Sequence, residues 1–327
     1  IVVTPGRFAI MHEDPVRRQT LSKEDIHTLP QLGEDIYRAI KRLPGISGND
    51  FSAKFTVRGG EHEEVLVMLD GLEMYEPFHL KDIYGGALSI VDVVAIGGID
   101  MMTGAFPAQY GNHMSGVFDI SSVKPNPRGR TAVGISLMNA RFLTEGQFDD
   151  GRGSWFVSAR RGYLDIVLSL MNEEDLSPSY YDVMAKTEYR LSDRHSLSAH
   201  ILRADDDLEF EENEDGDIAI TDYANTYGWL RLRSSLGAKL NAQTVLSLGQ
   251  ATDGRLGTDF RTIFITTPQI RRKIDLTGFE IREERSFNVA GLRQDWNWKA
   301  SERQHLNFGF AARRLTSDFD YFNWDLQ

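Results

Sequence analysis

The strongest constraint on the fold is an alternation of apolar and polar residues with a period of two, which recurs along the chain after residue 127. Clear runs lie at 133–137, 197–201, 229–233 and 306–313. Successive side chains of an extended strand point to opposite faces, so each run predicts a strand with one apolar and one polar face. The period alone leaves open whether the apolar face meets lipid or a second sheet. A soluble β-sandwich would bury Leu197, Ile201, Leu230 and Phe308.

The connections between these runs alternate between short and long. The short, polar ones are Asp149–Gly153, Ser192–His195, Leu240–Gln243 and Ser301–Gln304. The long ones are 168–180, 205–222 and 257–283. Outer-membrane barrels have short periplasmic turns and long external loops. Counting from a first strand near Thr131–Met138 and a second at Phe142–Phe148, we expect about nine antiparallel transmembrane strands. An odd count indicates an incomplete β-barrel, because single-chain bacterial barrels have even counts.

A different pattern precedes the proline-rich segment 124–127. Apolar residues at helical spacing predict a helix over Asp35–Leu43, which Pro44 ends. Short β-rich runs follow at 55–58, 65–69 and 93–96. We therefore expect an α+β domain at residues 29–124 and barrel strands at 125–327. Residues 1–28 are expected to be a linker or the exit from an N-terminal extension.

Several classes of protein are disfavoured by composition and motifs. The formal net charge of −12 argues against a nucleic-acid binder, which needs clustered Lys and Arg. The absence of cysteine removes thiolate nucleophiles and thiolate metal sites. No HExxH, Walker or GxSxG motif is present. We expect no enzyme, and we assign no catalytic residue, cofactor or metal site.

Four motifs in order resemble the plug domain of TonB-dependent outer-membrane receptors. They are DIYRAIKRLPGI at 35–46, FTVRG at 55–59, VLVMLDG at 65–71 and PAQYGNHMSGVFDISS at 107–122. One departure is MTGAFP at 102–107, where the family often has an Arg-Gly-Pro turn. The segment SWFVSARRGYLD at 154–165 resembles an early barrel strand of receptors that carry a folded extension before the plug.

The resemblance implies a barrel of about 22 strands with a plug in its lumen, in the bacterial outer membrane. It also implies a receptor and transporter that imports a scarce nutrient, such as an iron chelate, a cobalamin, a glycan or a peptide. Expected partners are a TonB-ExbB-ExbD-type energising complex, outer-membrane lipid, the nutrient and a surface lipoprotein. The TonB box is expected upstream of this chain. The alternative is a non-transporting surface β-protein that binds a ligand or partner.

The resemblance also marks candidate site residues in the plug. The motif and gating candidates are Arg58, Gly59, Asp70, Gly71, Tyr110, Gly111 and Gly116. The alternative is that Arg58 and Asp70 only end strands and that the glycines permit backbone geometry closed to other residues. The ligand candidates, in an apical loop, are Met74, Tyr75, Phe78 and His79. Aromatic rings offer contact area, and His79 offers a hydrogen bond or a metal contact. A loop packed against the barrel is the alternative.

Two further patterns have both a structural and a functional interpretation. The acidic run 205–217 is interpreted mainly as a solvated loop, with binding of a hard cation as the alternative. Aromatic residues near strand ends are candidates for an interfacial girdle, although soluble sheets also carry them. These residues are Trp155, Tyr163, Trp229, Trp296 and Trp298.

Overall fold

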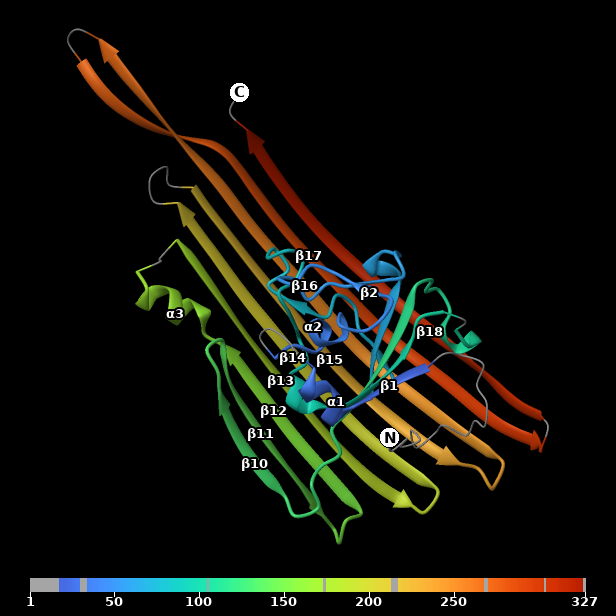
Figure 1. Ribbon diagram of the computed structural model, residues 1–327. Coiled ribbons are helices and arrows are strands. Elements are labelled where there is room, and N and C mark those ends of the chain that lie inside the picture. The colour runs from blue at the N-terminus through green and yellow to red at the C-terminus, as the bar shows by residue number, and fades with distance from the viewer. Residues whose placement is uncertain are drawn as a thin grey trace.

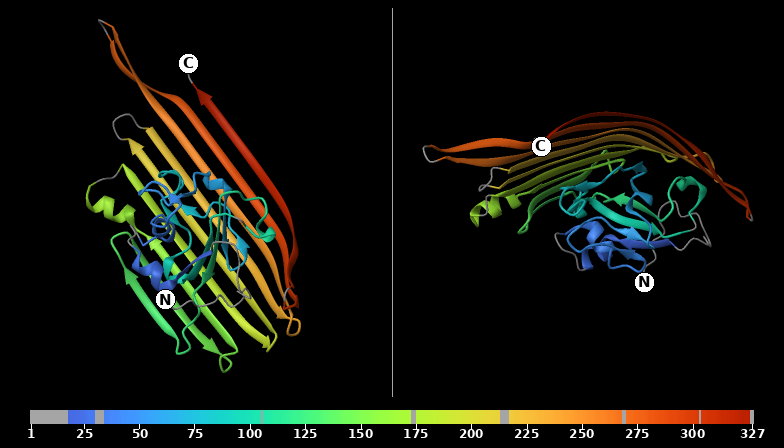
Figure 2. Two further views of the ribbon diagram at one scale, coloured as in Figure 1. Left: turned by 45° about the vertical axis from the view of Figure 1, so that its right-hand side comes forward. Right: turned by 90° about the horizontal axis from the view of Figure 1, so that it is seen from above.

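A small α+β unit rests against the concave face of a large curved sheet (Figure 1). The computed structural model describes residues 18–29, 34–104, 106–172, 175–212, 217–267, 270–302 and 304–325. Seen from above, the sheet arches over the N-terminal unit, and no other described element covers its convex face (Figure 2). No helix among these residues has the length and apolar character needed to cross a membrane.

The N-terminal unit is built on a mixed five-stranded sheet in the order β1-β8-β9-β4-β5. Its strands are β1 (Arg18–Ser22), β4 (Val65–Leu69), β5 (Leu72–Glu73), β8 (Ile96–Met102) and β9 (Gly116–Ser122). Two small ladders pair β2 (Ile46–Ser47) with β3 (Thr56–Val57) and β6 (Phe78–His79) with β7 (Leu88–Ser89). The helices are α1 (Lys23–Thr28), α2 (Ile36–Ile40), η1 (His62–Glu64), η2 (Val93–Ala95) and η3 (Ala108–Tyr110). Residues 18–28, expected to be a linker, thus supply β1 and α1 to this fold.

Helix α2 is shorter than the predicted helix over Asp35–Leu43. The Asp35 side chain caps it by accepting from the Arg38 amide at 3.0 Å. At the other end the Leu43 amide donates to the Ile40 carbonyl at 3.0 Å, a tighter turn than an α-helix makes. A proline disfavours helical geometry in the residue before it, so Pro44 explains why the helix ends early.

One β-rich run of the N-terminal unit was assigned wrongly. Residues 93–96 begin with the 3-10 turn η2, because the Asp92 side chain accepts from the Val94 amide at 3.3 Å and caps it. The runs at 55–58 and 65–69 do contain strands, β3 and β4.

The wall of nine antiparallel strands confirms the expected incomplete barrel. Its strands lie side by side in chain order from β10 to β18. They are β10 (Arg130–Ile135), β11 (Asn139–Phe148), β12 (Gly153–Gly162), β13 (Leu176–Ser192), β14 (His195–Glu212), β15 (Asp217–Ser235), β16 (Leu240–Thr267), β17 (Ile270–Ser301) and β18 (Gln304–Asp325). Helix α3 (Leu164–Leu170) lies between β12 and β13. The five-stranded sheet ends before the proposed boundary at residue 124 and the wall begins after it.

The short turns lie at one end of the wall, and one of them differs from its predicted position. Residues 149–152 and 193–194 connect strands as expected, whereas Leu240–Gln243 forms the start of β16. The turn lies at 236–239 instead, because Gly237 has a φ of 99°, which glycine adopts at little cost.

The predicted long loops at 205–222 and 257–283 are largely paired strands. The ladder between β14 and β15 continues to Glu212 and Asp217, and that between β16 and β17 continues to Thr267 and Ile270. A hairpin satisfies its backbone groups between its own two arms, so polar side chains on both faces do not prevent pairing. The hairpin of β16 and β17 extends far beyond its neighbours (Figure 1).

The two faces of the wall confirm the period of two. On the convex face Ile201, Leu230 and Leu248 are 51%, 45% and 67% exposed. On the concave face Leu202 and Ala204 are fully buried against the N-terminal unit. Ile201, Leu230 and Phe308 would be covered in a soluble sandwich, and their exposure contradicts that alternative. Trp229 also lies on the concave side, stacked 4.5 Å from the His200 ring, so it belongs to no outward-facing girdle.

A large hydrophobic cluster joins the two parts. In the N-terminal unit Phe55 packs edge-on against Phe118 with ring centroids 4.7 Å apart, and Tyr37 lies 5.4 Å from both Phe55 and Phe78. Wall residues complete the cluster, among them Phe156, Met184, Leu202, Tyr227 and Val245. The position of the N-terminal unit on the wall is therefore set by packing as well as by the polar contacts described next.

Candidate functional site

Two clusters of buried charge join the N-terminal unit to the wall. The first, the Asp70 cluster, consists of Asp70, Ser122, Lys186, His200 and Arg231. The second, the His79 cluster, consists of His79, Arg160, Tyr180, Asp182 and Asp206. In both clusters the wall contributes side chains from its concave face, where the strand period places polar residues.

Asp70 reaches the wall because the chain turns sharply after β4. Its φ is 48° and that of Gly71 is 90°. The Asp70 amide donates to the Ile120 carbonyl at 2.9 Å, which fixes the start of the turn. A Cβ atom on Gly71 would lie only 3.2 Å from Cγ2 of Val245, so the wall closely approaches the backbone here. The Asp-Gly motif therefore does more than end a strand.

The Asp70 carboxylate is held by positive groups of the wall. Lys186 Nζ lies 3.2 Å away, Arg231 Nη1 lies 3.3 Å away, and Ser122 of β9 donates its hydroxyl. Burial favours the neutral acid, but the charges of Lys186 and Arg231 outweigh it and hold the pKa of Asp70 well below its usual range. Asp70 is thus an ionised, buried anchor.

His79, at the end of β6, is bonded through both ring nitrogens. Its Nδ1 lies 2.9 Å from Oδ1 of Asp206 and its Nε2 lies 3.3 Å from Oδ2 of Asp182. Asp206 also accepts from the Leu80 amide at 2.5 Å, and Asp182 accepts from Nε of Arg160 at 2.7 Å. The imidazole has no exposed surface, so these are its polar partners.

The position of the His79 ring depends on a glycine in the wall. The Tyr180 ring lies 4.7 Å from the imidazole, and Tyr180 is paired across β12 and β13 with Gly162. A Cβ atom at residue 162 would lie 2.0 Å from the Tyr180 ring. Glycine at position 162 therefore leaves room for the Tyr180 ring to lie over it.

The two carboxylates favour the charged form of His79. Burial alone lowers the pKa of an imidazole, but the hydrogen bonds and charges of Asp182 and Asp206 outweigh it and raise the pKa of His79 above its ordinary value. A doubly protonated ring donates to both acids at once. With Arg160 included, two positive and two negative groups balance each other.

Further ion pairs join the segment after Gly71 to later strands. Arg313 of β18 lies 2.7 Å from Glu73, Lys81 lies 3.0 Å from Asp253 of β16, and Asp82 lies 2.7 Å from Arg255. Beside them is a cavity of about 370 Å³, which Tyr75 helps to line. This cavity faces away from the short turns.

Three of the four residues of the predicted ligand loop are buried in this chain. Met74, Phe78 and His79 are 5%, 1% and 0% exposed, and Phe78 and His79 form β6, which pairs with β7 inside the N-terminal unit. Contact of these three residues with a ligand stays a prediction. Tyr75 differs: it is half-buried, lines the cavity of about 370 Å³ and lies 5.4 Å from the Phe287 ring. Its role in binding a ligand stays a prediction.

Replacing Phe78 with Ala should lower stability and leave ligand affinity unchanged. The ring packs against Tyr37 and His62, with centroids 5.4 and 4.8 Å away, and its loss should cost about 3–5 kcal/mol. Urea unfolding of the complete protein measures the change. The matched control is Phe51→Ala, since Phe51 is 61% exposed and its truncation should cost less than about 0.5 kcal/mol. Normal stability with weakened ligand binding would restore the original assignment.

The other motif residues have separate roles. Arg58 has a φ of 51°, is exposed and makes no ion pair with a described residue of the wall, so of Arg58 and Asp70 only Asp70 is ion-paired to it. Gly59 also has a positive φ, 78°. Tyr110 is buried beneath the Arg293 guanidinium, Gly111 is exposed, and a Cβ on Gly116 would lie 2.9 Å from Val57.

Sequence reasoning missed the wall's half of both clusters. Asp206 lies in the acidic run interpreted as a solvated loop, yet it is buried in β14. The available signal was the period of two, since 198, 200, 202, 204 and 206 share one face. Within the described residues no group of acidic or histidine side chains is arranged to hold a metal ion.

Comparison with known families agrees with this architecture. Residues 11–117 match the family model of the TonB-dependent Receptor Plug Domain. Residues 11–117 therefore correspond to a TonB-dependent receptor plug domain, and the wall that follows has the fold of an incomplete barrel. A plug of this family, joined to outer-membrane barrel strands, places the chain in the bacterial outer membrane.

Solved outer-membrane proteins share the fold at low sequence identity. The outer membrane transporter YddB from Escherichia coli matches with a TM-score of 0.66 and 12% identity over 92% of this chain and 48% of that one. FpvA of P. aeruginosa, bound to heterologous pyoverdines, matches with a TM-score of 0.61 and 12% identity over 96% of this chain and 44% of its own. The ferric enterobactin receptor PfeA of Pseudomonas aeruginosa gives 0.54 and 12% over 92% and 58%. The chain thus spans about half the length of these proteins.

Proposed function

We propose that this chain is the plug and adjoining barrel wall of an importer that takes up a scarce nutrient, with an iron chelate as the substrate class. Two of the matched proteins, the ferric enterobactin receptor PfeA and the pyoverdine-bound FpvA, support this substrate class. A TonB-ExbB-ExbD-type complex supplies the energy, and the plug moves away from the wall to open a path.

The observation that carries this proposal is the ionic attachment of the plug. Asp70 and His79 bind the wall through buried ion pairs, which are stable while intact and weaken sharply when one partner is removed or rehydrated. Apolar side chains would hold two permanently attached domains together as well as ion pairs do. An ionic contact suits a plug that is held firmly and then released by force.

The experiment is a reversible cross-link between plug and wall. The chain has no cysteine, so an introduced pair is the only thiol pair it contributes. Gly71→Cys with Val245→Cys uses the 3.2 Å approach at this point. In the complete receptor, oxidation should abolish TonB-dependent growth on an iron chelate, and reduction should restore it, because a tethered plug cannot leave the wall.

The controls separate tethering from strain and binding from transport. Gly71→Cys alone carries the backbone strain of a positive φ and should remain active under oxidation. Chelate binding to cells should persist in the oxidised double variant. Undiminished growth with a complete cross-link would disprove plug displacement, and binding without any TonB-dependent growth would favour a non-transporting receptor.

A further inference from the structure

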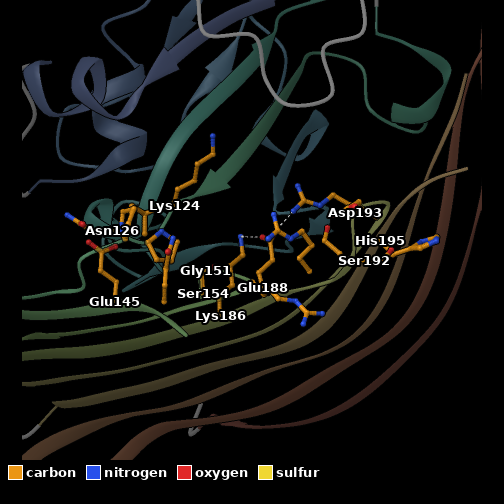
Figure 3. Close-up of a pocket in the computed structure, with 18 of the residues that line it drawn as sticks. Lys124, Asn126, Glu145, Gly151, Ser154, Lys186, Glu188, Ser192, Asp193 and His195 are labelled. Carbon is orange, nitrogen blue, oxygen red and sulfur yellow. Dashed lines mark hydrogen bonds and ion pairs between the residues drawn. The ribbon is translucent and has the colours of Figure 1, made fainter. Parts of the chain in front are cut away.

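A large cavity lies between the end of the plug and the short-turn end of the wall (Figure 3). Its volume is about 940 Å³, enough for a drug-sized molecule. Lys23 of the plug and residues 123–127, which lead from the plug to the wall, line one side, and the ends of β10 to β16 line the other. Figure 3 shows Lys186 and Glu188 of β13 beside the turn that carries Asp193.

The lining of this cavity is strongly basic. Eight Lys or Arg residues line it against three Asp or Glu, although the whole chain has a net charge of −12. Two of the three acids are already neutralised: Glu145 lies 2.8 Å from Arg130, and Glu188 is paired with Arg233 and Lys186. The cavity therefore has a surplus of positive charge in an acidic protein.

Two arginines in this lining have no ionic partner. Arg190 lies near the end of β13 and Arg194 in the turn that follows, and neither side chain forms an ion pair with any described residue. Arginine binds carboxylate and phosphate groups in a two-pronged geometry. A single exposed arginine without an ionic partner is common on a protein surface. Here two of them border the same basic cavity.

We propose that this cavity binds a solute with two or more carboxylate or phosphate groups, anchored by Arg190 and Arg194. The inference rests on the proposed importer, in which the cavity is the last stop for an anionic cargo before it leaves at the short-turn end. Low-dielectric walls concentrate the positive potential and attract such a solute. Lys186 is excluded as a test residue, because it also holds Asp70 of the plug.

The test is calorimetric titration of citrate, and separately of pyrophosphate, into the complete receptor in detergent at low salt. Arg190→Gln with Arg194→Gln should weaken binding at least about tenfold, and salt should weaken binding to the unmodified protein. The matched control is Arg128→Gln with Lys239→Gln, which removes two charges at the same end of the wall from residues outside the lining. The control should bind within about twofold of the unmodified protein.

Three results would overturn the inference: neither anion binds, both double variants lose affinity equally, or only micelles containing phosphatidylglycerol bind. The last result would assign the arginines to a lipid headgroup.

Failure of this inference can be distinguished from failure of the proposed function. If the plug cross-link stops uptake but neither citrate nor pyrophosphate binds, import stands and the anionic cargo is rejected. If an anion binds but the cross-link leaves uptake intact, plug displacement is rejected.

Discussion

Asp70→Asn should loosen the plug from the barrel wall. The variant leaves Lys186 and Arg231 buried without their counter-ion, and breaking a buried ion pair in this way costs about 3–5 kcal/mol. Asparagine tolerates the left-handed backbone that Asp70 adopts, so the effect reports charge and not backbone strain. Hydrogen exchange of the β4 and β9 amides in the complete receptor measures the loss.

Two comparisons make this result specific. Asp50→Asn removes an acid of the plug that is 72% exposed and should change protection little. Lys186→Met in the Asp70→Asn background should recover part of the loss, because it removes one of the stranded charges. Unchanged exchange in Asp70→Asn would mean that packing alone holds the plug in place.

His79→Leu should release the other attachment of the plug. The leucine leaves Asp182 and Asp206 buried without the imidazolium, and this should cost about 3–5 kcal/mol. Urea unfolding of the complete receptor measures the difference. His62→Leu is the control: His62 is a partly buried plug histidine whose ring is hydrogen-bonded to the Phe55 carbonyl and not to an acid, so its loss should cost less.

The contacts of His79 with Asp182 and Asp206 also predict that the stability of the protein depends on pH. The pKa of His79 is raised in the folded protein, because the acids outweigh the opposing effect of burial. Its contribution is therefore complete below about pH 6.5, the value for an unfolded chain, and is lost as the pH rises through the higher folded value. As the pH rises through the folded pKa of His79, the unmodified protein should lose the stability that the charged imidazole provides. The His79→Leu variant should lack this loss. A parallel decline in both would exclude His79 as its source.

Much of the wall could be predicted from the sequence because its determinants are local. Alternating polarity defines the strands, and tight turns such as 149–152 lie between them. The ends of the strands were harder to predict, since the segments 205–222 and 257–283 were interpreted as loops although their backbones pair. The turn at 236–239 depended on a single glycine, Gly237.

The charge clusters depended on contacts distant in sequence. His79 meets Asp206 across 127 positions, and only the register of β6 against β7 and of the plug against the wall brings them together. Aromatic and histidine residues after an Asp-Gly turn look equally suited to ligand binding and to core packing. The pairing of β6 with β7 buries Phe78 and His79, whereas Tyr75 lies at a cavity.

The uneven length of the wall strands determines the direction from which a molecule can approach. Strand β12 has 10 residues and β17 has 32, which correspond to roughly 34 and 110 Å of extended chain. At the end opposite the short turns the rim therefore rises from a low side at β10 to β12 to a tall side at β16 and β17. A molecule that approaches over β10 to β12 meets a lower rim than one that approaches over β16 and β17. This part of the mouth is a one-sided scoop and not a symmetrical funnel.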